Sequence, residues 1–224
     1  MNYQKMKKVE LLWMCSHKCQ AHSIRYIEHP LCYERENPDK NKIGIIDIEA
    51  SNLKADFGVV ICYAIRDLTG PGLISRIVTK KELFDKKHEP DYWVMKDLCE
   101  DIRKYDRLIG FYSSDGKFDI PFLRSRAVSQ NLCFPGYGEV MMEDVWPIIR
   151  YKFALSSNRL ANASRFLVGE SNKTNWFARY WIRAVQGDKD ALIYIKDHCE
   201  RDVEDLRKLY LKVSKFKRQG NTSI

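Results

Sequence analysis

The fold of this chain rests on one stretch, Ile43-Gly44-Ile45-Ile46-Asp47-Ile48-Glu49. Its isoleucines predict a buried β-strand, and the stretch ends in two acids. Successive side chains on a strand point to opposite faces, so Asp47 and Glu49 project to the same side, about 7 Å apart along the strand. Carboxylate oxygens are preferred ligands of hard divalent cations. The pair therefore predicts metal ligands at the end of a strand.

Hydrophobic patterns outside this stretch predict an α/β domain. Further strands are expected at about 57–66, 73–79, 107–112 and 140–145. Helices are expected at 92–105 and 118–129, and from Ser156 the chain is mostly helical, ending in a long helix to about Lys215. We expect residues 41–216 to form this domain, after a Cys- and His-rich extension at 1–40 and before a flexible tail at 217–224.

Composition indicates a globular, unexported protein. The chain has 224 residues, of which 45% are hydrophobic, enough to bury a core. No apolar run approaches the roughly 20 residues that span a bilayer, and Met1 to Glu10 lacks the hydrophobic segment of a signal peptide. We therefore expect a cytoplasmic protein with no membrane partner. The net charge of +8, concentrated at both ends, is compatible with a nucleic-acid partner.

The last predicted helix carries an acid on its apolar face. Asp202 lies in the middle of a stripe that is formed, at helical spacing, by Ile195, Cys199, Leu206, Leu209 and Val213. A carboxylate facing a core is costly unless it is paired or coordinates a metal. His198, one turn earlier, lies at the edge of the same stripe. Asp202 is therefore a candidate metal ligand, and an ordinary buried ion pair is the alternative.

Two neighbouring acids are expected on the solvated side of this helix. Glu204 points away from the stripe and can pair with Lys208, and Asp205 can pair with Arg201. Charge pairs of this kind are usually surface pairs. We therefore expect Glu204 and Asp205 to be solvated.

A third acidic position follows the strand predicted at 107–112. The sequence from Leu108 to Leu123 is typical of a strand, a polar turn and a helix, with Asp119 at the helix start. Alone, Asp119 would be interpreted as a helix cap. Together with the other acids it completes a set that could converge on two Mg²⁺ ions about 4 Å apart: Asp47, Glu49, Asp119 and Asp202. His198 would then act as the general base or orient the attacking water.

Three motifs in this order resemble the DEDD superfamily of 3′-to-5′ exonucleases, DnaQ-like nucleases with a ribonuclease H-like fold. Asp47-Ile48-Glu49 matches the first motif, D-x-E; the stretch from Gly110 to Leu123 resembles the second; and residues 198–203 resemble the third. The match covers residues 43–213 and is closest to stand-alone relatives of the family-B polymerase proofreading domain. In the family, the third motif has Tyr separated from Asp by three residues, or His separated by four. Here His198 has the tyrosine spacing.

The resemblance implies a central mixed sheet of about five strands flanked by helices, and a site that uses two Mg²⁺ or Mn²⁺ ions. The four acids would be the metal ligands. With His198 they would make up the catalytic set, which is Asp47, Glu49, Asp119, His198 and Asp202.

The resemblance also suggests where the substrate binds. Arg159, Asn172 and Lys173 lie in a stretch similar to one found between the second and third motifs, and Phe118 belongs to the second motif. These residues are candidate contacts to nucleic acid, because phosphate contacts commonly come from such side chains. Plain solvation of the loop charges is the alternative.

The extension contains a dense group of potential metal ligands. Three of the seven cysteines and three of the five histidines fall there: Cys15, His17, Cys19, His22, His29 and Cys32. Four N/S ligands in a segment that cannot build a core suit a structural Zn²⁺. We expect the ligands to be Cys15, His29 and Cys32 with either His17 or Cys19, although the spacing is not that of a standard finger. The alternative is a loosely ordered arm that packs on the domain through Leu11, Leu12 and Trp13.

Two classes of function are compatible with these features. The leading hypothesis is a 3′-to-5′ exonuclease that hydrolyses phosphodiester bonds of DNA or RNA by a two-metal mechanism. The alternatives are a catalytically weak nucleic-acid-binding or adaptor protein on the same fold, and a structure-specific endonuclease that uses the same site. A polymerase or repair protein is a candidate partner, since no polymerase module accompanies the domain.

Overall fold

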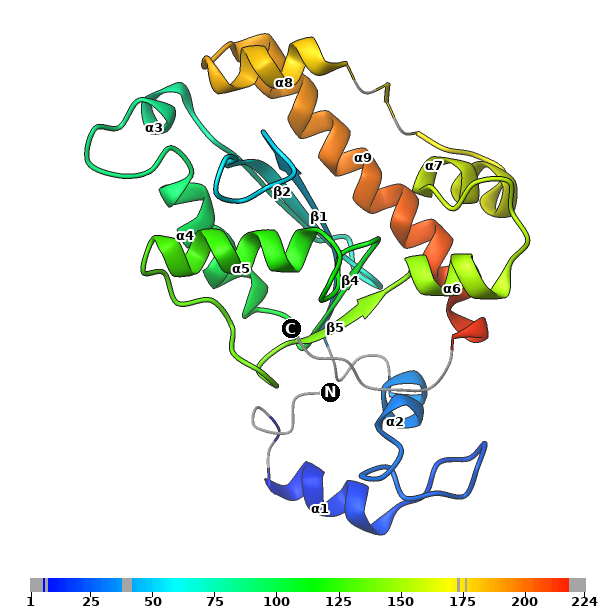
Figure 1. The fold of residues 1–224 in the computed structure, drawn as a ribbon. Helices are drawn as coiled ribbons and strands as arrows, with labels where there is room; N and C mark the ends of the chain where they lie inside the picture. The colour runs from blue at the N-terminus through cyan, green and yellow to red at the C-terminus, as the bar shows by residue number, and fades with distance from the viewer. Residues whose placement is uncertain (1–5, 7, 38–41, 173, 176, 218–224) are drawn as a thin grey trace.

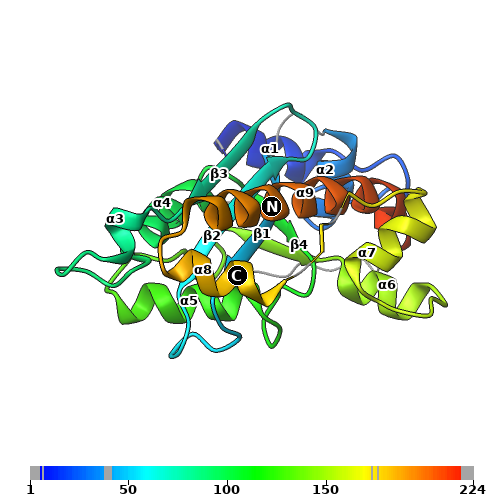
Figure 2. The same ribbon diagram turned by 90° about the horizontal axis from the view of Figure 1, so that it is seen from above.

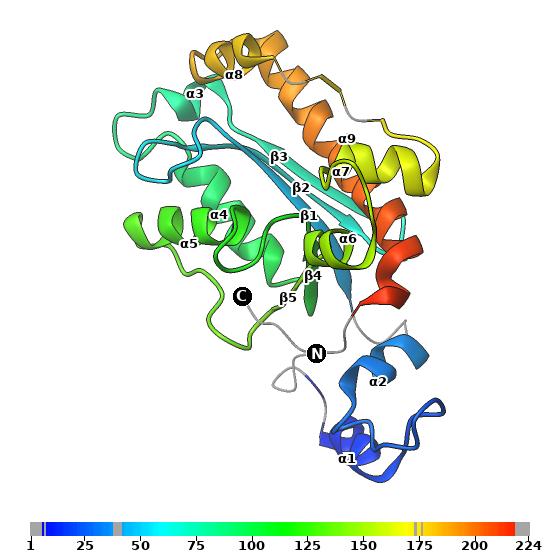
Figure 3. The same cartoon turned by 45° about the vertical axis from the view of Figure 1, so that its right-hand side comes forward.

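The computed structural model describes residues 6, 8–37, 42–172, 174–175 and 177–217. Lys173 and most of the predicted tail lie outside these residues. The extension holds α1 (Lys8–Ser16) and α2 (Pro30–Glu36) and has a small buried cluster of its own. Figures 1 and 3 show these two helices together, set apart from the sheet and the helices around it. A second, larger cluster of buried residues forms the core of the domain.

A five-stranded sheet forms the centre of the domain, with strand order β3-β2-β1-β4-β5. Its strands are β1 (Ile43–Ala50), β2 (Val60–Asp67), β3 (Leu73–Ile77), β4 (Arg107–Gly110) and β5 (Met141–Asp144). β1, β2 and β3 pair antiparallel, whereas β4 pairs parallel with both β1 and β5. The structure confirms the predicted α/β fold with a mixed sheet, and each predicted strand is present.

Helices cover the sheet on both sides. α4 (Tyr92–Ile102) and α5 (Asp119–Ser129) lie on one side; α9 (Lys189–Val213) runs alongside β1 and β2 on the other, with α8 (Ala178–Val185) packed against it (Figures 1 and 3). Figures 1 and 2 place α6 (Trp146–Lys152) and α7 (Leu160–Ala163) beside the C-terminal part of α9. The remaining segments are α3 (Lys80–Leu83), a π-helical turn η3 (Ser164–Val168) and a 3₁₀ turn η4 (Ser214–Phe216). Among the described residues, no helix is both long and apolar enough to cross a membrane.

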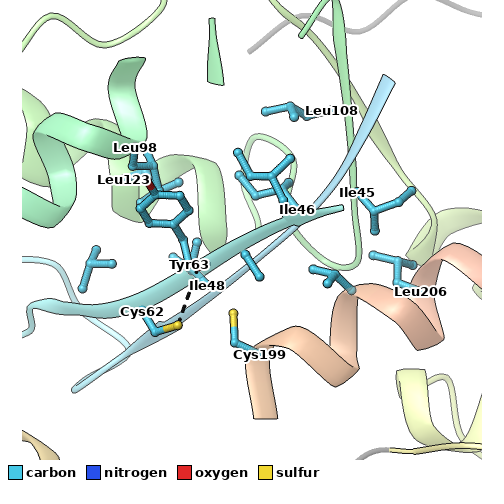
Figure 4. Packing of buried hydrophobic residues seen from close by; sticks show 14 of the residues in the cluster. Ile45, Ile46, Ile48, Cys62, Tyr63, Leu98, Leu108, Leu123, Cys199 and Leu206 are labelled. Atoms are coloured by element: carbon cyan, nitrogen blue, oxygen red, sulfur yellow. Dashed lines mark hydrogen bonds between the residues drawn. The ribbon is translucent and has the colours of Figure 1, made fainter. Parts of the chain in front are cut away.

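The core forms where the alternating side chains of β1 meet a different helix layer on each face. Figure 4 shows Ile45 beside Leu206 of α9, and Tyr63 of β2 together with Leu98 of α4 and Leu123 of α5. All of these side chains are almost completely buried. Because neighbouring side chains on a strand alternate, Asp47 and Glu49 share the face of Ile45, which is the face that α9 covers. The hydrophobic packing of Ile45 therefore directs the two acids toward α9.

β4 ends at Gly110, two residues earlier than predicted. Tyr112 has a φ of 66°, in the left-handed region, so the chain turns out of the extended conformation before that residue. A bulky residue adopts this conformation only when its surroundings hold it there. Because β4 is short, its pairing with β1 stops at Ile45, and in the described part of the chain no strand pairs with the end of β1 on that side.

A buried ion pair joins three elements on the α4–α5 side of the sheet. Asp91 is 0% exposed and precedes α4; its Oδ1 and Oδ2 accept hydrogen bonds from Arg126 Nη2 and Nε of α5 at 2.6 and 3.0 Å. Oδ2 also accepts one from Val60 N of β2 at 2.9 Å, and Oδ1 one from Gln130 Nε2 at 2.8 Å. The carboxylate therefore links α4, α5 and β2.

We predict that Asp91→Ala lowers the free energy of unfolding by about 3–5 kcal/mol, because it leaves the buried Arg126 guanidinium with only the exposed carboxylate of Glu89 as a counter-charge, at 3.4 Å. The matched control is Asp115→Ala, which removes an ion pair with Arg124 whose carboxylate is 59% exposed. That change should cost less than about 1 kcal/mol. Urea unfolding of the two variants measures both values, and equal losses would contradict the structural role of Asp91.

Candidate active site

β1 carries Asp47 and Glu49 beyond the end of its parallel neighbour. The register pairs residues 43–45 of β1 with 107–109 of β4, whereas Asp47 and Glu49 lie opposite Ala64 and Cys62 of β2. In open α/β sheets, ligands bind at the carboxyl ends of parallel strands, where the strand order changes direction. β1, between β2 and β4, ends at such a position. The two acids therefore lie at the position where sheets of this kind bind ligands.

α9 places the side chains of His198 and Asp202 beside Glu49 at the end of β1. His198 Nε2 lies 3.6 Å from Glu49 Oε1 and 3.9 Å from Asp202 Oδ2. Ligand atoms of these three residues all lie within 4.8 Å of one another, as metal binding requires. His198 and Asp202 are 2% and 3% exposed. The spacing of four residues puts them one helical turn apart on one face of α9, so both side chains reach this point.

Two residues that the sequence did not single out hold Glu49 and His198 in place. Trp181 of α8 donates a hydrogen bond from Nε1 to Glu49 Oε2 at 3.2 Å, and its ring meets the His198 ring edge to face at 5.5 Å. Thr174 Oγ1 is hydrogen-bonded to His198 Nδ1. Contacts of this kind orient ligand side chains. Neither residue belongs to one of the three motifs, although Thr174 ends the stretch that resembles one between the second and third motifs. Both reach the site through the packing of α8 and the segment before it.

A cavity of about 580 Å³ lies beside the acids, and we call it the acid-lined cavity. Asp47 and Asp202 both line it, and other lining residues are Tyr112, Trp146, Arg159 and Arg165. The Tyr112 and Trp146 rings meet edge to face with centroids 5.3 Å apart. Lys117 Nζ lies 4.4 Å from the Trp146 ring centroid. The cavity thus combines acids, aromatic rings and cations.

Asp119 is the first residue of α5 and is 5% exposed. Ser113 Oγ donates a hydrogen bond to its Oδ2, and Gly110 makes room for Ser113, because a Cβ at residue 110 would lie 2.3 Å from that Oγ. Burial raises the pKa of the Asp119 carboxyl to about 7; the hydrogen bond from Ser113 opposes this shift and the charge of Asp144 adds to it. In the described chain, Asp119 belongs to neither group of clustered ligand atoms.

Asp144 at the end of β5 orders the turn that precedes Asp119. Its carboxylate accepts hydrogen bonds from three consecutive backbone N–H groups, those of Tyr112, Ser113 and Ser114, at 2.9–3.2 Å. It also accepts one from Ser114 Oγ at 3.0 Å and one from Trp146 N at 2.9 Å. These bonds hold Tyr112 in its left-handed conformation and place Ser113 against Asp119. From the sequence, Asp144 could be recognised only as an acid near the end of a predicted strand. Its hydrogen-bond partners could not be predicted.

The expectation that Asp205 is solvated was wrong. Asp205 is 1% exposed and accepts hydrogen bonds from Ser171 Oγ at 2.8 Å, Asn172 N at 2.9 Å and Asn172 Nδ2 at 3.2 Å. Its expected partner Arg201 pairs with Asp197 instead, at 2.7 Å. The chain after η3 folds back over α9 and supplies donors that helical periodicity cannot foresee. The amide of Asn172, a predicted substrate contact, is thereby engaged with Asp205.

Glu204 also has partners other than the expected Lys208. Its carboxylate lies 3.3 Å from Arg66 Nε of β2 and 3.4 Å from Arg207 Nη1. Lys208 pairs instead with Glu170, at 2.6 Å. Arg66 belongs to the sheet and Glu170 to the segment after η3, whereas Arg207 lies in α9 itself. The surface pairs of α9 are therefore tertiary contacts as well as contacts within the helix.

The other predicted substrate contacts differ in position. Arg159 is exposed and lines the acid-lined cavity. Phe118 is partly buried and packs against the core, with its ring centroid 5.3 Å from that of Phe122. Lys173 lies outside the described residues.

The extension brings together a different set of cysteines and histidines from the one expected. The clustered ligand atoms belong to Cys19, His22, His29 and Cys32. Cys15 is exposed and outside this group, and His17 stacks on Trp13 with ring centroids 4.1 Å apart. Trp13, the predicted contact to the domain, also stacks on Tyr26 of the extension. His22 was not among the expected ligands. The mirrored spacing of Cys19-x₂-His22 and His29-x₂-Cys32 in the sequence could have indicated it.

Comparison with known proteins gives one result for the domain. A family model described as the RNase H superfamily matches residues 45–214. This range begins inside β1 and ends just after α9, so it contains every candidate catalytic residue. No curated protein matches the chain.

We predict that Asp119 makes a contribution to the stability of the metal-free protein that declines as the pH rises from about 4 to about 7. The folded-state pKa of Asp119, about 7, exceeds the unfolded value near 3.8, so in this range the unfolded chain ionises first and unfolding becomes more favourable. Asp119→Asn removes this contribution and should flatten the decline. Urea unfolding in EDTA across this pH range tests the prediction, and identical slopes for the parent and the variant would contradict it.

Proposed function

Because the chain belongs to the RNase H superfamily, we propose that it is a metal-dependent 3′-to-5′ exonuclease acting on DNA or RNA. Membership implies a nuclease-type activity and a nucleic-acid substrate. The observation that carries the finer proposal is the convergence of Glu49, His198 and Asp202 at the carboxyl end of β1. A polymerase or repair protein as partner stays a prediction from the sequence.

The donor set suits hard divalent cations. Mg²⁺ and Mn²⁺ prefer carboxylate oxygens, and three carboxylates, Asp47, Glu49 and Asp202, lie where β1 meets α9. In the proposal these residues hold the metal, and Asp119 is the fourth acid. Bound ions would supply the Lewis acidity that activates water and neutralises charge on the phosphodiester. The protein contributes by keeping the acids fixed and largely out of solvent.

His198 is proposed to position the attacking water. When Thr174 Oγ1 accepts a hydrogen bond from Nδ1–H, Nε2 carries the lone pair and faces the acids. In that tautomer Nε2 can accept a hydrogen bond from water and take its proton. Its distances of 3.6 and 3.9 Å to Glu49 and Asp202 place it beside the reacting position.

The acid-lined cavity suits the end of a nucleic-acid strand. Its volume of about 580 Å³ lies within the usual range for small-ligand sites, which favours a terminal nucleotide over an internal duplex segment. Tyr112 and Trp146 offer aromatic rings for a base, and base stacking on aromatic side chains binds single strands without regard to sequence. Arg159 and Arg165 can neutralise phosphates.

We predict that Asp202→Asn lowers kcat about a thousandfold, since losing a metal-binding carboxylate costs several kcal/mol of transition-state stabilisation. The control is Asp190→Asn, an exposed acid in the first turn of the same helix, which should keep parental activity. Release of nucleotides from DNA and RNA oligonucleotides labelled at either end, with Mg²⁺ or Mn²⁺, measures the effect.

The same assay separates the competing functions. A binding or adaptor protein would hold oligonucleotides in a salt-dependent way and leave them intact with Mn²⁺. An endonuclease would open a circular substrate, which an exonuclease cannot attack. If Asp202→Asn digests a linear strand as fast as the parent, the proposed site is wrong.

We predict that Trp146→Ala raises KM for single strands by about 5- to 150-fold, because stacking contributes about 1–3 kcal/mol per base. The value of kcat should change less, since in the proposal Trp146 contacts a base and does not hold the metal. Tyr137→Ala is the control, because that ring is 91% exposed and lies outside the acid-lined cavity. A loss confined to kcat would contradict a substrate-binding role.

A further inference from the structure

The extension brings four potential ligands together from two local structures. Residues 17–26 form a tight hairpin, in which Cys19 N donates to Ile24 O at 2.8 Å and Tyr26 N donates to His17 O at 3.0 Å. Cys19 and His22 lie in this hairpin. His29 immediately precedes α2, and Cys32 lies in the first turn of that helix. Each local structure therefore supplies one thiol and one imidazole at a spacing of three residues.

The distances between these ligand atoms match the edges of a tetrahedral metal site. Cys19 Sγ lies 3.4 Å from His29 Nδ1 and 3.8 Å from His22 Nδ1, and Cys32 Sγ lies 3.4 Å from His22 Nδ1. With Zn–S near 2.3 Å and Zn–N near 2.0–2.1 Å, tetrahedral geometry separates sulfur and nitrogen by about 3.6 Å. All four atoms also lie within 4.8 Å of one another. Pairwise hydrogen bonds would not require this mutual closeness.

We propose that Cys19, His22, His29 and Cys32 bind a structural Zn²⁺. Two thiolates and two imidazoles in tetrahedral array favour zinc over the oxygen-preferring ions Mg²⁺ and Ca²⁺. Four protein ligands fill the coordination shell, which is typical of a structural site and not a catalytic one. Both histidines bind through Nδ1, the atom that faces the sulfurs.

The small core of the extension explains why a metal is needed. Among the described residues, its buried cluster consists of Met14, Cys19, Tyr26, Cys32 and Tyr33, and two of these five are ligands. Units below about 40 residues rarely fold without disulfides, metals or partners, and each of the seven cysteines is a free thiol. In the proposal, the free energy of zinc binding therefore supplies most of the folding free energy of the extension. The core of the domain is a separate cluster, so its folding does not depend on the ion.

The test measures zinc in the full-length protein, purified without chelators, by elemental analysis. Cobalt replacement adds a second readout, because thiolate-bound tetrahedral Co²⁺ has charge-transfer and visible absorption bands that a carboxylate site lacks. The ligand variants are Cys32→Ser and His22→Ala. Their matched controls are Cys15→Ser and His17→Ala, which change the same residue types outside the cluster.

We expect one thiolate-bound metal per chain in the parent and in both controls, and its loss in both ligand variants. The thermal unfolding transition of the domain should persist in every variant, which separates loss of the site from general misfolding. Absence of the thiolate–cobalt bands from the parent would overturn the proposal. So would their retention in Cys32→Ser, or their loss in Cys15→Ser. None of these readouts depends on nuclease activity.

Discussion

The packing of α9 against the end of β1 buries the Asp202 carboxylate on the apolar face of α9. There it lies opposite Asp47 and Glu49, which β1 directs toward α9. Three carboxylates held this close repel one another, and burying them costs free energy, unless a cation lies among them. The remaining features of the site support this arrangement. Early termination of β4 leaves the end of β1 open, and Trp181 and Thr174 fix the side chains that α9 brings in.

Features that depend on local sequence periodicity could be predicted. The alternation along β1 gave the common face of Asp47 and Glu49, and the stripe on α9 gave the burial of Asp202. These periodicities predicted all five strands and the helices α4, α5 and α9 that cover the sheet, because each is a property of the backbone geometry of one element. The order of the motifs indicated DEDD exonucleases, and the comparison confirms the broader part of that prediction, membership of the RNase H superfamily.

Features that depend on contacts between distant segments could not be predicted. Asp205 has the same helical spacing as a surface acid, yet the segment after η3 covers it and donates hydrogen bonds. Asp144 orders a turn 30 or more residues earlier, and only the pairing of β4 with β5 makes that possible. In the extension, six candidates competed for four places, and the hairpin at 17–26 selected His22 over Cys15 and His17. In each case the missing information was the path of the chain between elements.

We propose that the acids at the junction of β1 and α9 form a binding site for divalent cations. The most direct test is a crystal structure of the protein grown with saturating Mn²⁺, with anomalous differences measured to locate the ion. We predict manganese peaks in contact with the carboxylates of Asp47, Glu49 and Asp202. Manganese bound only elsewhere, or no anomalous peak at this junction, would show that these acids are not a binding site for divalent cations.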